Sequence, residues 1–175
     1  MQERAVPNVL TAEHDPHVRA DVHSALENAG FAICAAARDG FEVVRLARQH
    51  QPDLILLGLE LPRLDGAEAI RRIRHERDVP IVLLTEDGDG DLVGKAIKAG
   101  ALSWMRKPIR TNELVDTLLG TLVMHREDTL QRQRQESHRT IRTMLRHLSF
   151  PDDWAADIEA RCFRAGRVWR STSSG

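Results

Sequence analysis

The stretch PDLILLGLELPRLDG, residues 52–66, decides the fold of this 175-residue chain. Residues 54–57 form an unbroken apolar run, which is typical of a strand buried on both faces of a parallel sheet. The run stops at Gly58 and leads into a loop, residues 61–66, with the sequence LPRLDG. Open α/β sheets build their sites in such loops, at the carboxyl ends of the strands. We therefore expect any binding or chemistry to lie beside Gly58.

Strand and helix patterns alternate on both sides of this central strand. Short apolar segments predict strands at residues 8–12, 31–36, 54–57, 80–85 and 101–105. Amphipathic patterns between and after them predict helices, and Asp39 and Asp65 each open an acid-x-x-Glu capping box. This alternation predicts a flavodoxin-like (βα)5 fold of the α/β class, a doubly wound parallel sheet of strand order 2-1-3-4-5 with right-handed crossovers.

The sequence divides into a domain at residues 6–124 and a helical extension of two segments. Residues 1–124 hold 15 Lys and Arg against 19 Asp and Glu, whereas residues 125–175 hold 10 against 7, so the C-terminal part is mildly basic. The last helix of the domain is predicted to continue through residues 125–149 as an exposed helix with a weak coiled-coil seam. Residues 150–175 predict a short amphipathic helix and a loose C-terminus.

The predicted seam combines apolar and polar side chains. Its positions follow 4-3-4-3-4 spacing at Leu130, Arg134, Ser137, Ile141, Met144 and Leu148. Heptad spacing is typical of helices that pair, and closed twofold dimers are the commonest oligomers. We therefore predict a homodimer. In the last segment Trp154 and Trp169 are expected to pack on the long helix or on a partner, because large aromatic rings are costly to leave in water.

Cysteine usage and hydropathy exclude several classes of protein. Cys34 lies in an apolar run and Cys162 lies far from it, so neither a disulfide framework nor a zinc site is predicted. Both cysteines are interpreted as small core residues. No apolar stretch reaches the roughly 18 residues of a membrane span, and the N-terminus lacks a signal pattern. We expect a cytoplasmic protein that does not associate with membranes.

Three further positions join the central loop in one pattern. Thr85 ends the fourth predicted strand, Trp104 lies within the fifth, and Lys107-Pro108 follows it. Together with the LPRLDG loop they resemble the CheY-like receiver domain of bacterial response regulators. The resemblance implies a phosphorylated aspartate after strand three and an acidic pair that binds Mg²⁺ after strand one. It also implies that Thr85, Lys107 and Trp104 are the hydroxyl, lysine and aromatic switch positions, and that the bond before Pro108 is cis.

Two positions depart from the receiver pattern. Gly58 stands at the phosphoacceptor position, and glycine has no side chain to phosphorylate. The acidic pair is Glu13-His14, and imidazole suits zinc, copper or nickel better than Mg²⁺, which prefers oxygen ligands. The resemblance therefore implies a degenerate receiver, or pseudo-receiver, without enzyme activity and without a cofactor, in which Mg²⁺ binding is lost or weak.

The residual pocket is expected to hold Glu13, His14, Glu60, Thr85, Glu86 and Lys107. Glu86 stands where receivers usually carry a small residue, and Glu13, Glu60 or Glu86 can each supply the carboxylate that Lys107 would otherwise lack. One alternative is that Asp65 or Glu60 accepts a phosphoryl group, although Asp65 fits a helix cap better. Another is a transition-metal site of Glu13, His14 and Glu60, but a histidine beside acids on a loop is ordinarily solvated or salt-bridged, and no metal site is predicted.

These observations predict a phosphorylation-independent module that binds a protein partner in two-component-type signalling and forms a homodimer. The alternative is a nucleic-acid-binding transcriptional or antitermination regulator, in which the Arg-rich helix at residues 126–146 contacts phosphates. The basic residues of that helix alternate with acidic ones, which favours a solvated helix face over a nucleic-acid footprint.

Overall fold

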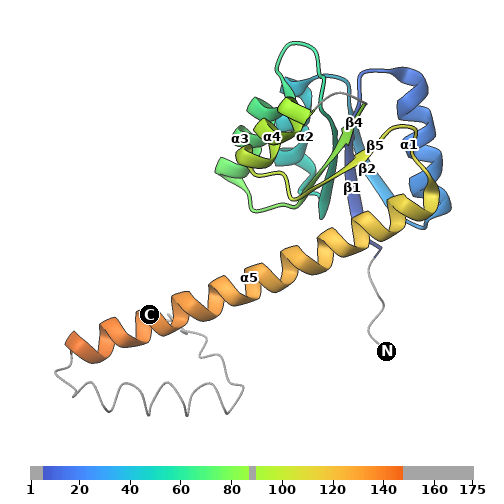
Figure 1. Ribbon diagram of the computed structural model, residues 1–175. Coiled ribbons are helices and arrows are strands. Elements are labelled where there is room, and N and C mark those ends of the chain that lie inside the picture. Colours follow the sequence, from blue (N-terminus) through green and yellow to red (C-terminus); the bar gives the residue numbers. More distant parts are fainter. Residues whose placement is uncertain (1–5, 87–89, 148–175) are drawn as a thin grey trace. The chain divides into compact units, whose positions relative to one another are not determined.

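The computed structural model describes residues 6–86 and 90–147 (Figure 1). Contacts divide the chain into two compact units, Met1–His125 and Arg126–Gly175. The described residues form five strands: β1 Asn8–Ala12, β2 Ala32–Ala37, β3 Leu54–Gly58, β4 Ile81–Thr85 and β5 Ser103–Arg106. They also form five helices: α1 Pro16–Asn28, α2 Gly40–His50, α3 Gly66–Glu76, α4 Gly90–Ala99 and α5 Thr111–His147.

The strands run parallel in one sheet, and their order is β2-β1-β3-β4-β5. Figure 1 shows α1 and the start of α5 on one face of the sheet, and α2, α3 and α4 on the other. A parallel sheet with helices on both faces and this strand order is the flavodoxin-like doubly wound fold. The fold predicted from the sequence is confirmed.

The central strand β3 is buried along its whole length, which explains its unbroken apolar sequence. Ile55 and Leu57 belong to the core cluster that packs with α2, α3 and α4. Leu54 and Leu56 belong to the cluster that packs with α1 and α5. Because successive side chains of a strand point to opposite faces, a strand between two helical layers carries apolar residues at every position.

Aspartates cap the starts of α1, α2 and α3. The Asp39 side chain accepts a hydrogen bond from the Glu42 backbone N–H at 2.9 Å, and the Asp65 side chain accepts one from that of Glu68 at 2.9 Å. The glutamates do not complete the predicted capping boxes. Glu42 accepts from the Arg38 backbone N–H instead, and Glu68 pairs with two arginines of its own helix. The predicted caps are therefore confirmed, but each box is only half formed.

Strands β2 and β5 begin later than the sequence predicted. The backbone N–H of Phe31 donates to the Leu26 carbonyl oxygen at 3.0 Å, so residue 31 closes the turn after α1. The backbone N–H of Ala101 donates to the Ala96 carbonyl oxygen at 3.0 Å and closes α4 in the same way. Both residues are buried and apolar. Their hydropathy matches a strand, while their backbones complete the end of a helix.

Cys34 lies on β2, an edge strand of the described sheet. It packs against the core cluster but is only partly buried, so the predicted core position is confirmed in part. Burial raises the pKa of its thiol. Cys162 lies outside the described residues. Within residues 6–86 and 90–147, no helix has the length and apolar character needed to cross a membrane.

Helix α5 is continuous for 37 residues, which confirms that the last helix of the domain extends past residue 124. Leu114 and Leu118, near its start, are fully buried in the core. Exposed apolar side chains recur along one side of α5 at helical spacing: Leu119, Val123, Leu130 and Met144. The last seam position, Leu148, and the segment at residues 150–175 that holds Trp154 and Trp169 lie outside the described residues.

Candidate functional site at the carboxyl edge of the sheet

The site forms where β1 and β3 end side by side. In their parallel register Ala12 pairs with Leu57, so the following residues, Glu13 and Gly58, reach the same edge of the sheet together. Strand β4 pairs with β3 on its other side and ends at Thr85. The sheet itself therefore brings together the positions that the sequence predicted after strands one, three and four.

The Glu13 carboxylate is buried, with a side-chain exposure of 1%, and is held from several directions. Its Oε1 accepts a hydrogen bond from the Asp15 backbone N–H at 3.1 Å and lies 3.2 Å from Nδ1 of His14. Its Oε2 lies 2.9 Å from Nζ of Lys107. Among the described residues no donor is aligned for a hydrogen bond to Oε2, so its contact with Lys107 is a pairing of charges.

Lys107 has two carboxylates within ion-pair distance. Its Nζ lies 2.9 Å from Glu13 Oε2 and 3.6 Å from Glu86 Oε1. The Lys107 side chain is 14% exposed, whereas that of Glu86 is 69% exposed. Water weakens charge pairs strongly, so the buried Glu13 is the stronger partner of Lys107. Of the three glutamates that the sequence left open, Glu13 occupies the inner position, Glu86 lies at the rim, and Glu60 is exposed on the loop after β3.

Gly58 leaves room for the Glu13 side chain. A Cβ atom on residue 58 would lie 2.7 Å from Glu13 Oε2 and 3.2 Å from the Ala12 carbonyl oxygen. Real Cβ atoms essentially never approach another heavy atom more closely than 3.0 Å. The phosphoacceptor position therefore lacks a side chain, and the space beside it is taken by a carboxylate from the end of β1.

Thr85 and Trp104 lie at the hydroxyl and aromatic positions. Thr85 is 3% exposed, and its Oγ1 donates a hydrogen bond to the Met105 carbonyl oxygen at 3.3 Å. Trp104 is 49% exposed on the edge strand β5. The hydroxyl is thus engaged with the backbone of β5, and the indole lies at the surface. The peptide bond between Lys107 and Pro108 is cis, as the resemblance implied.

The other acidic residues near this edge either cap the start of a helix or are exposed to solvent. Asp65 caps α3, as its sequence context predicted. Asp15 caps α1, and two backbone N–H groups of that helix hold the pKa of its carboxyl group below its ordinary value. Glu60 is exposed. None of these three carboxylates is paired with Lys107 among the described contacts.

The residues at this edge do not fit a magnesium ion. Mg²⁺ takes oxygen ligands in near-octahedral geometry, but Gly58 supplies no ligand and His14 supplies a nitrogen. One oxygen of Glu13 is in contact with the Lys107 ammonium. Within residues 6–86 and 90–147, no group of three or more His, Cys, Asp or Glu side chains is arranged to hold a metal ion. The alternative transition-metal site of Glu13, His14 and Glu60 does not form either.

Arg19 belongs to the site although no sequence pattern selected it. Its Nη1 donates to the carbonyl oxygens of Glu13 and His14, at 2.8 and 3.3 Å. It reaches from the first turn of α1 back to the end of β1, and so orients the loop that carries Glu13. The available signal is an arginine four residues after the N-cap Asp15, but many exposed helix faces carry arginine at such a position.

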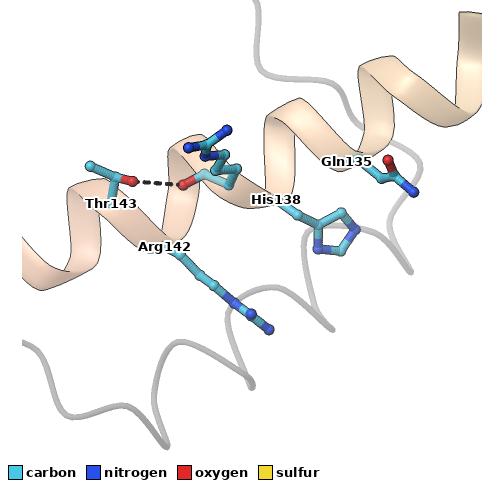
Figure 2. Close-up of a pocket in the computed structure, with 5 residues that line it drawn as sticks. Gln135, His138, Arg142 and Thr143 are labelled. Carbon is cyan, nitrogen blue, oxygen red and sulfur yellow. Dashed lines mark hydrogen bonds between the residues drawn. The ribbon is translucent and has the colours of Figure 1, made fainter.

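Cavities lie beside Lys107 and, separately, on α5. The first has a volume of about 350 Å³ and is lined by Val18, Asp21, Glu86, Lys107, Pro108 and Ile109. The second, of about 580 Å³, is lined by Gln135, His138, Arg139, Arg142 and Thr143. Figure 2 shows Gln135, His138 and Arg142 projecting from the same side of the helix. Thr143 Oγ1 donates to the Arg139 carbonyl oxygen at 2.9 Å, so its hydroxyl is engaged with the helix backbone.

The fold and the residues at its carboxyl edge define a receiver-type signalling domain. In agreement, the sequence profile of the response regulator receiver domain matches residues 9–119. The chain belongs to the response regulator receiver domain family.

Curated relatives include bacterial transcriptional regulators. The chain is 38% identical over 128 residues to the transcriptional regulatory protein PdtaR of Mycobacterium tuberculosis. This match covers 73% of this chain and 62% of PdtaR. It is 35% identical over 105 residues to the transcriptional regulatory protein AfsQ1 of Streptomyces coelicolor. That match covers 60% of this chain and 46% of AfsQ1. The matched region therefore spans less than two thirds of either relative.

Solved receiver domains share the fold. The receiver domain of the sensor histidine kinase PA1611 from Pseudomonas aeruginosa has a TM-score of 0.62 and 31% identity, over 67% of this chain and 98% of that domain. Its crystal structure contains a magnesium ion coordinated in the active-site cleft. The receiver domain of an HD domain-containing protein from Pseudomonas fluorescens has a TM-score of 0.67 at 24% identity, over 74% of this chain and 96% of that domain, which shows the fold alone.

Proposed function

We propose that the domain is a phosphorylation-independent pseudo-receiver, which acts through association rather than through phosphoryl transfer. The observation that carries the proposal is that Gly58 offers no acceptor while Lys107 is already paired with Glu13. Covalent transfer needs a side chain that can form the intermediate. The proposal therefore includes no enzyme activity and no Mg²⁺ cofactor.

Exposed apolar side chains support association with a protein partner. In the first unit Leu92 and Ile97 of α4 and Trp104 of β5 are 38%, 41% and 49% exposed. Four more lie along one side of α5 with exposures of 46–60%: Leu119, Val123, Leu130 and Met144. Burying apolar surface contributes about 25 cal/mol per Å². Because this row follows the side of one long helix, we propose that its partner is the same row on a second copy.

The setting of this association is two-component-type signalling in the cytoplasm. The transcriptional role of PdtaR and AfsQ1 belongs to those proteins, which extend beyond the matched region. For this chain we propose that the homodimer presents its receiver domains to a protein partner. The output then depends on which surfaces the dimer exposes.

Two measurements on the full chain test the proposal. Incubation with acetyl phosphate and Mg²⁺, followed by intact-mass spectrometry, should add no phosphoryl mass, whereas a receiver that retains its aspartate is labelled in parallel. Light scattering at micromolar concentration should give the mass of a dimer, and a chain ending at Val123 should give a monomer. A labelled full chain would refute the phosphorylation-independent proposal, and a monomeric full chain would refute dimerisation.

Nucleic-acid binding is a second candidate function, favoured by the second unit. There His138, Arg139 and Arg142 of α5 line one cavity. Figure 2 shows His138 and Arg142 projecting from the same side of the helix. Protein–phosphate contacts release counterions, so binding weakens as the salt concentration rises. A plot of the logarithm of the binding constant against the logarithm of the salt concentration has a slope of about −0.7 to −0.9 per neutralised phosphate. A salt titration with labelled single-stranded RNA and duplex DNA therefore tests this candidate. An absence of binding at low salt would eliminate it.

A further inference from the structure

We propose that Glu13 has replaced the missing aspartate as the resident counter-ion of Lys107, and that Gly58 is the residue that makes this replacement possible. We call this arrangement the carboxylate exchange. The end of β3 lacks a carboxylate because it carries Gly58, and Glu13 at the end of β1 supplies one instead. It deepens the proposed function, on which its meaning for signalling rests. Its test measures stability and not phosphorylation.

The space between Gly58 and Lys107 is filled by the Glu13 carboxylate. Glu13 Oε2 lies 2.9 Å from the Lys107 ammonium and 2.7 Å from where a Cβ atom on residue 58 would be. A Cβ atom at residue 58 therefore requires the Glu13 carboxylate, the far end of a flexible side chain, to shift from its present position beside Lys107. The remaining contacts of Glu13, with the Asp15 backbone N–H and with His14, hold the carboxylate in this position.

The charges of Glu13 and Lys107 balance each other away from water. Lys107 is 14% exposed and Glu13 is 1% exposed, so Glu13 depends on Lys107 for its counter-charge and is the only buried carboxylate among the two described partners of Lys107. A second carboxylate in the same space would leave one negative charge without a partner. Glu86 does not have this constraint, because it is 69% exposed. The interior of the site therefore has room and charge balance for one carboxylate.

This limit on space and charge predicts that substitutions at residues 13 and 58 have coupled effects on the stability of the domain. Gly58→Asp alone places two carboxylates in a space for one. Glu13→Ala alone leaves Lys107 with only the exposed Glu86. Combining Gly58→Asp with Glu13→Ala supplies a single carboxylate again, now from the end of β3. The double variant should therefore be more stable than either single variant, although both single changes are destabilising.

Thermal unfolding of the full chain and its variants tests the exchange. Gly58→Asp and Glu13→Ala should each lower the melting temperature by on the order of 10 °C, as expected when a buried ion pair loses its balance. The double variant should melt above both. Gly120→Asp is the matched control, because Gly120 lies on α5 with no atom within 4 Å of the place of a Cβ, and this change should have a small effect.

A double variant that melts no higher than the more stable of the two single variants would overturn the exchange. If a single variant does not fold, the double variant decides alone: a folded double supports the exchange and an unfolded one refutes it. Labelling of the unmodified chain by acetyl phosphate would refute the pseudo-receiver proposal and leave this comparison unchanged. The two proposals therefore fail in distinguishable ways.

Discussion

The Nζ atom of Lys107 lies 2.9 Å from Oε2 of Glu13, although β3 and β4 separate β1 from β5 in the sheet. The pair thus spans the carboxyl edge of the sheet and closes the place where receivers carry their acceptor. Removing one member of a buried ion pair typically costs about 3–5 kcal/mol, because it leaves the other charge uncompensated. We therefore expect the stability of the domain to depend strongly on both Glu13 and Lys107.

Lys107→Met should lower the free energy of unfolding by about 3–5 kcal/mol, because Glu13 then remains buried without its ammonium. Adding Glu13→Gln should recover part of the loss, since the amide keeps the shape without the charge. Urea denaturation measures both changes. The control is Lys95→Met on the exposed side of α4, which should alter stability by about 0.5 kcal/mol or less. A Lys107→Met variant as stable as this control would contradict the assignment.

Leu130→Lys should convert the proposed dimer to a monomer without loss of helix content. Leu130 is 50% exposed in the single chain, so the substitution removes little from the fold but places a charge in the proposed contact. Light scattering gives the mass and circular dichroism gives the helix content. Gln131→Lys, an exposed neighbour on a different side of α5, should leave the dimer intact. Equal masses for the two variants would exclude this row as the dimer contact.

Asp39→Ala should lower the free energy of unfolding near neutral pH by about 1 kcal/mol, because the residue is the N-cap of α2. The Glu42 backbone N–H, followed by Arg63, holds the pKa of the Asp39 carboxyl below its ordinary value of 3.8. A carboxyl whose pKa is lowered by folding stabilises the protein above the unfolded pKa, and this contribution is lost as the pH falls through the folded pKa.

The difference between the parent chain and Asp39→Ala should therefore shrink as the pH falls below 3.8. Urea midpoints over a pH series measure it. Asp39→Asn is the matched control, because its amide oxygen can still accept the cap hydrogen bond while the charge is gone. It should lose less stability than Asp39→Ala near neutral pH. A constant difference at every pH would show that the charge of Asp39 contributes nothing.

Gly40→Ala should destabilise the domain by about 2–3 kcal/mol, because a Cβ atom there overlaps the Leu64 carbonyl oxygen in the loop after β3. Backbone atoms of that loop cannot move aside as a flexible side chain can. Gly120→Ala, in open space on α5, should instead stabilise by up to about 1 kcal/mol. Chemical denaturation compares them, and a neutral Gly40→Ala would mean that the loop yields at little cost.

The fold follows from local patterns, and for that reason it was predictable. The apolar residues 54–57 indicate burial on both faces, and Asp39 and Asp65 mark helix starts without reference to distant residues. The starts of β2 and β5 were less predictable, because the buried apolar residues Phe31 and Ala101 close the turn after a helix. The hydropathy of such a residue is the same whether it starts a strand or closes the end of a helix. Only the partner of its backbone hydrogen bond differs.

The site was predicted as a set of residues but not as a set of contacts. Gly58, Thr85 and Lys107 were selected by the resemblance to receiver domains, which places them at or just after strand ends. The choice among three glutamates for Lys107 depends on which side chain reaches it most closely, and Glu13 does so through space that a Cβ atom on residue 58 would crowd. Arg19 was missed for a similar reason: its contact is with the backbone of Glu13, which no residue pattern encodes.

Glu13 and Lys107 belong to the same chain, so their encounter does not depend on the concentration of a metal, a phosphoryl donor or the protein itself. The proposed dimerisation would depend on the protein concentration, by mass action. If the pocket is constant and association is variable, the abundance of the chain is the signal. Synthesis and degradation would then set its output, where other receivers are set by a chemical mark.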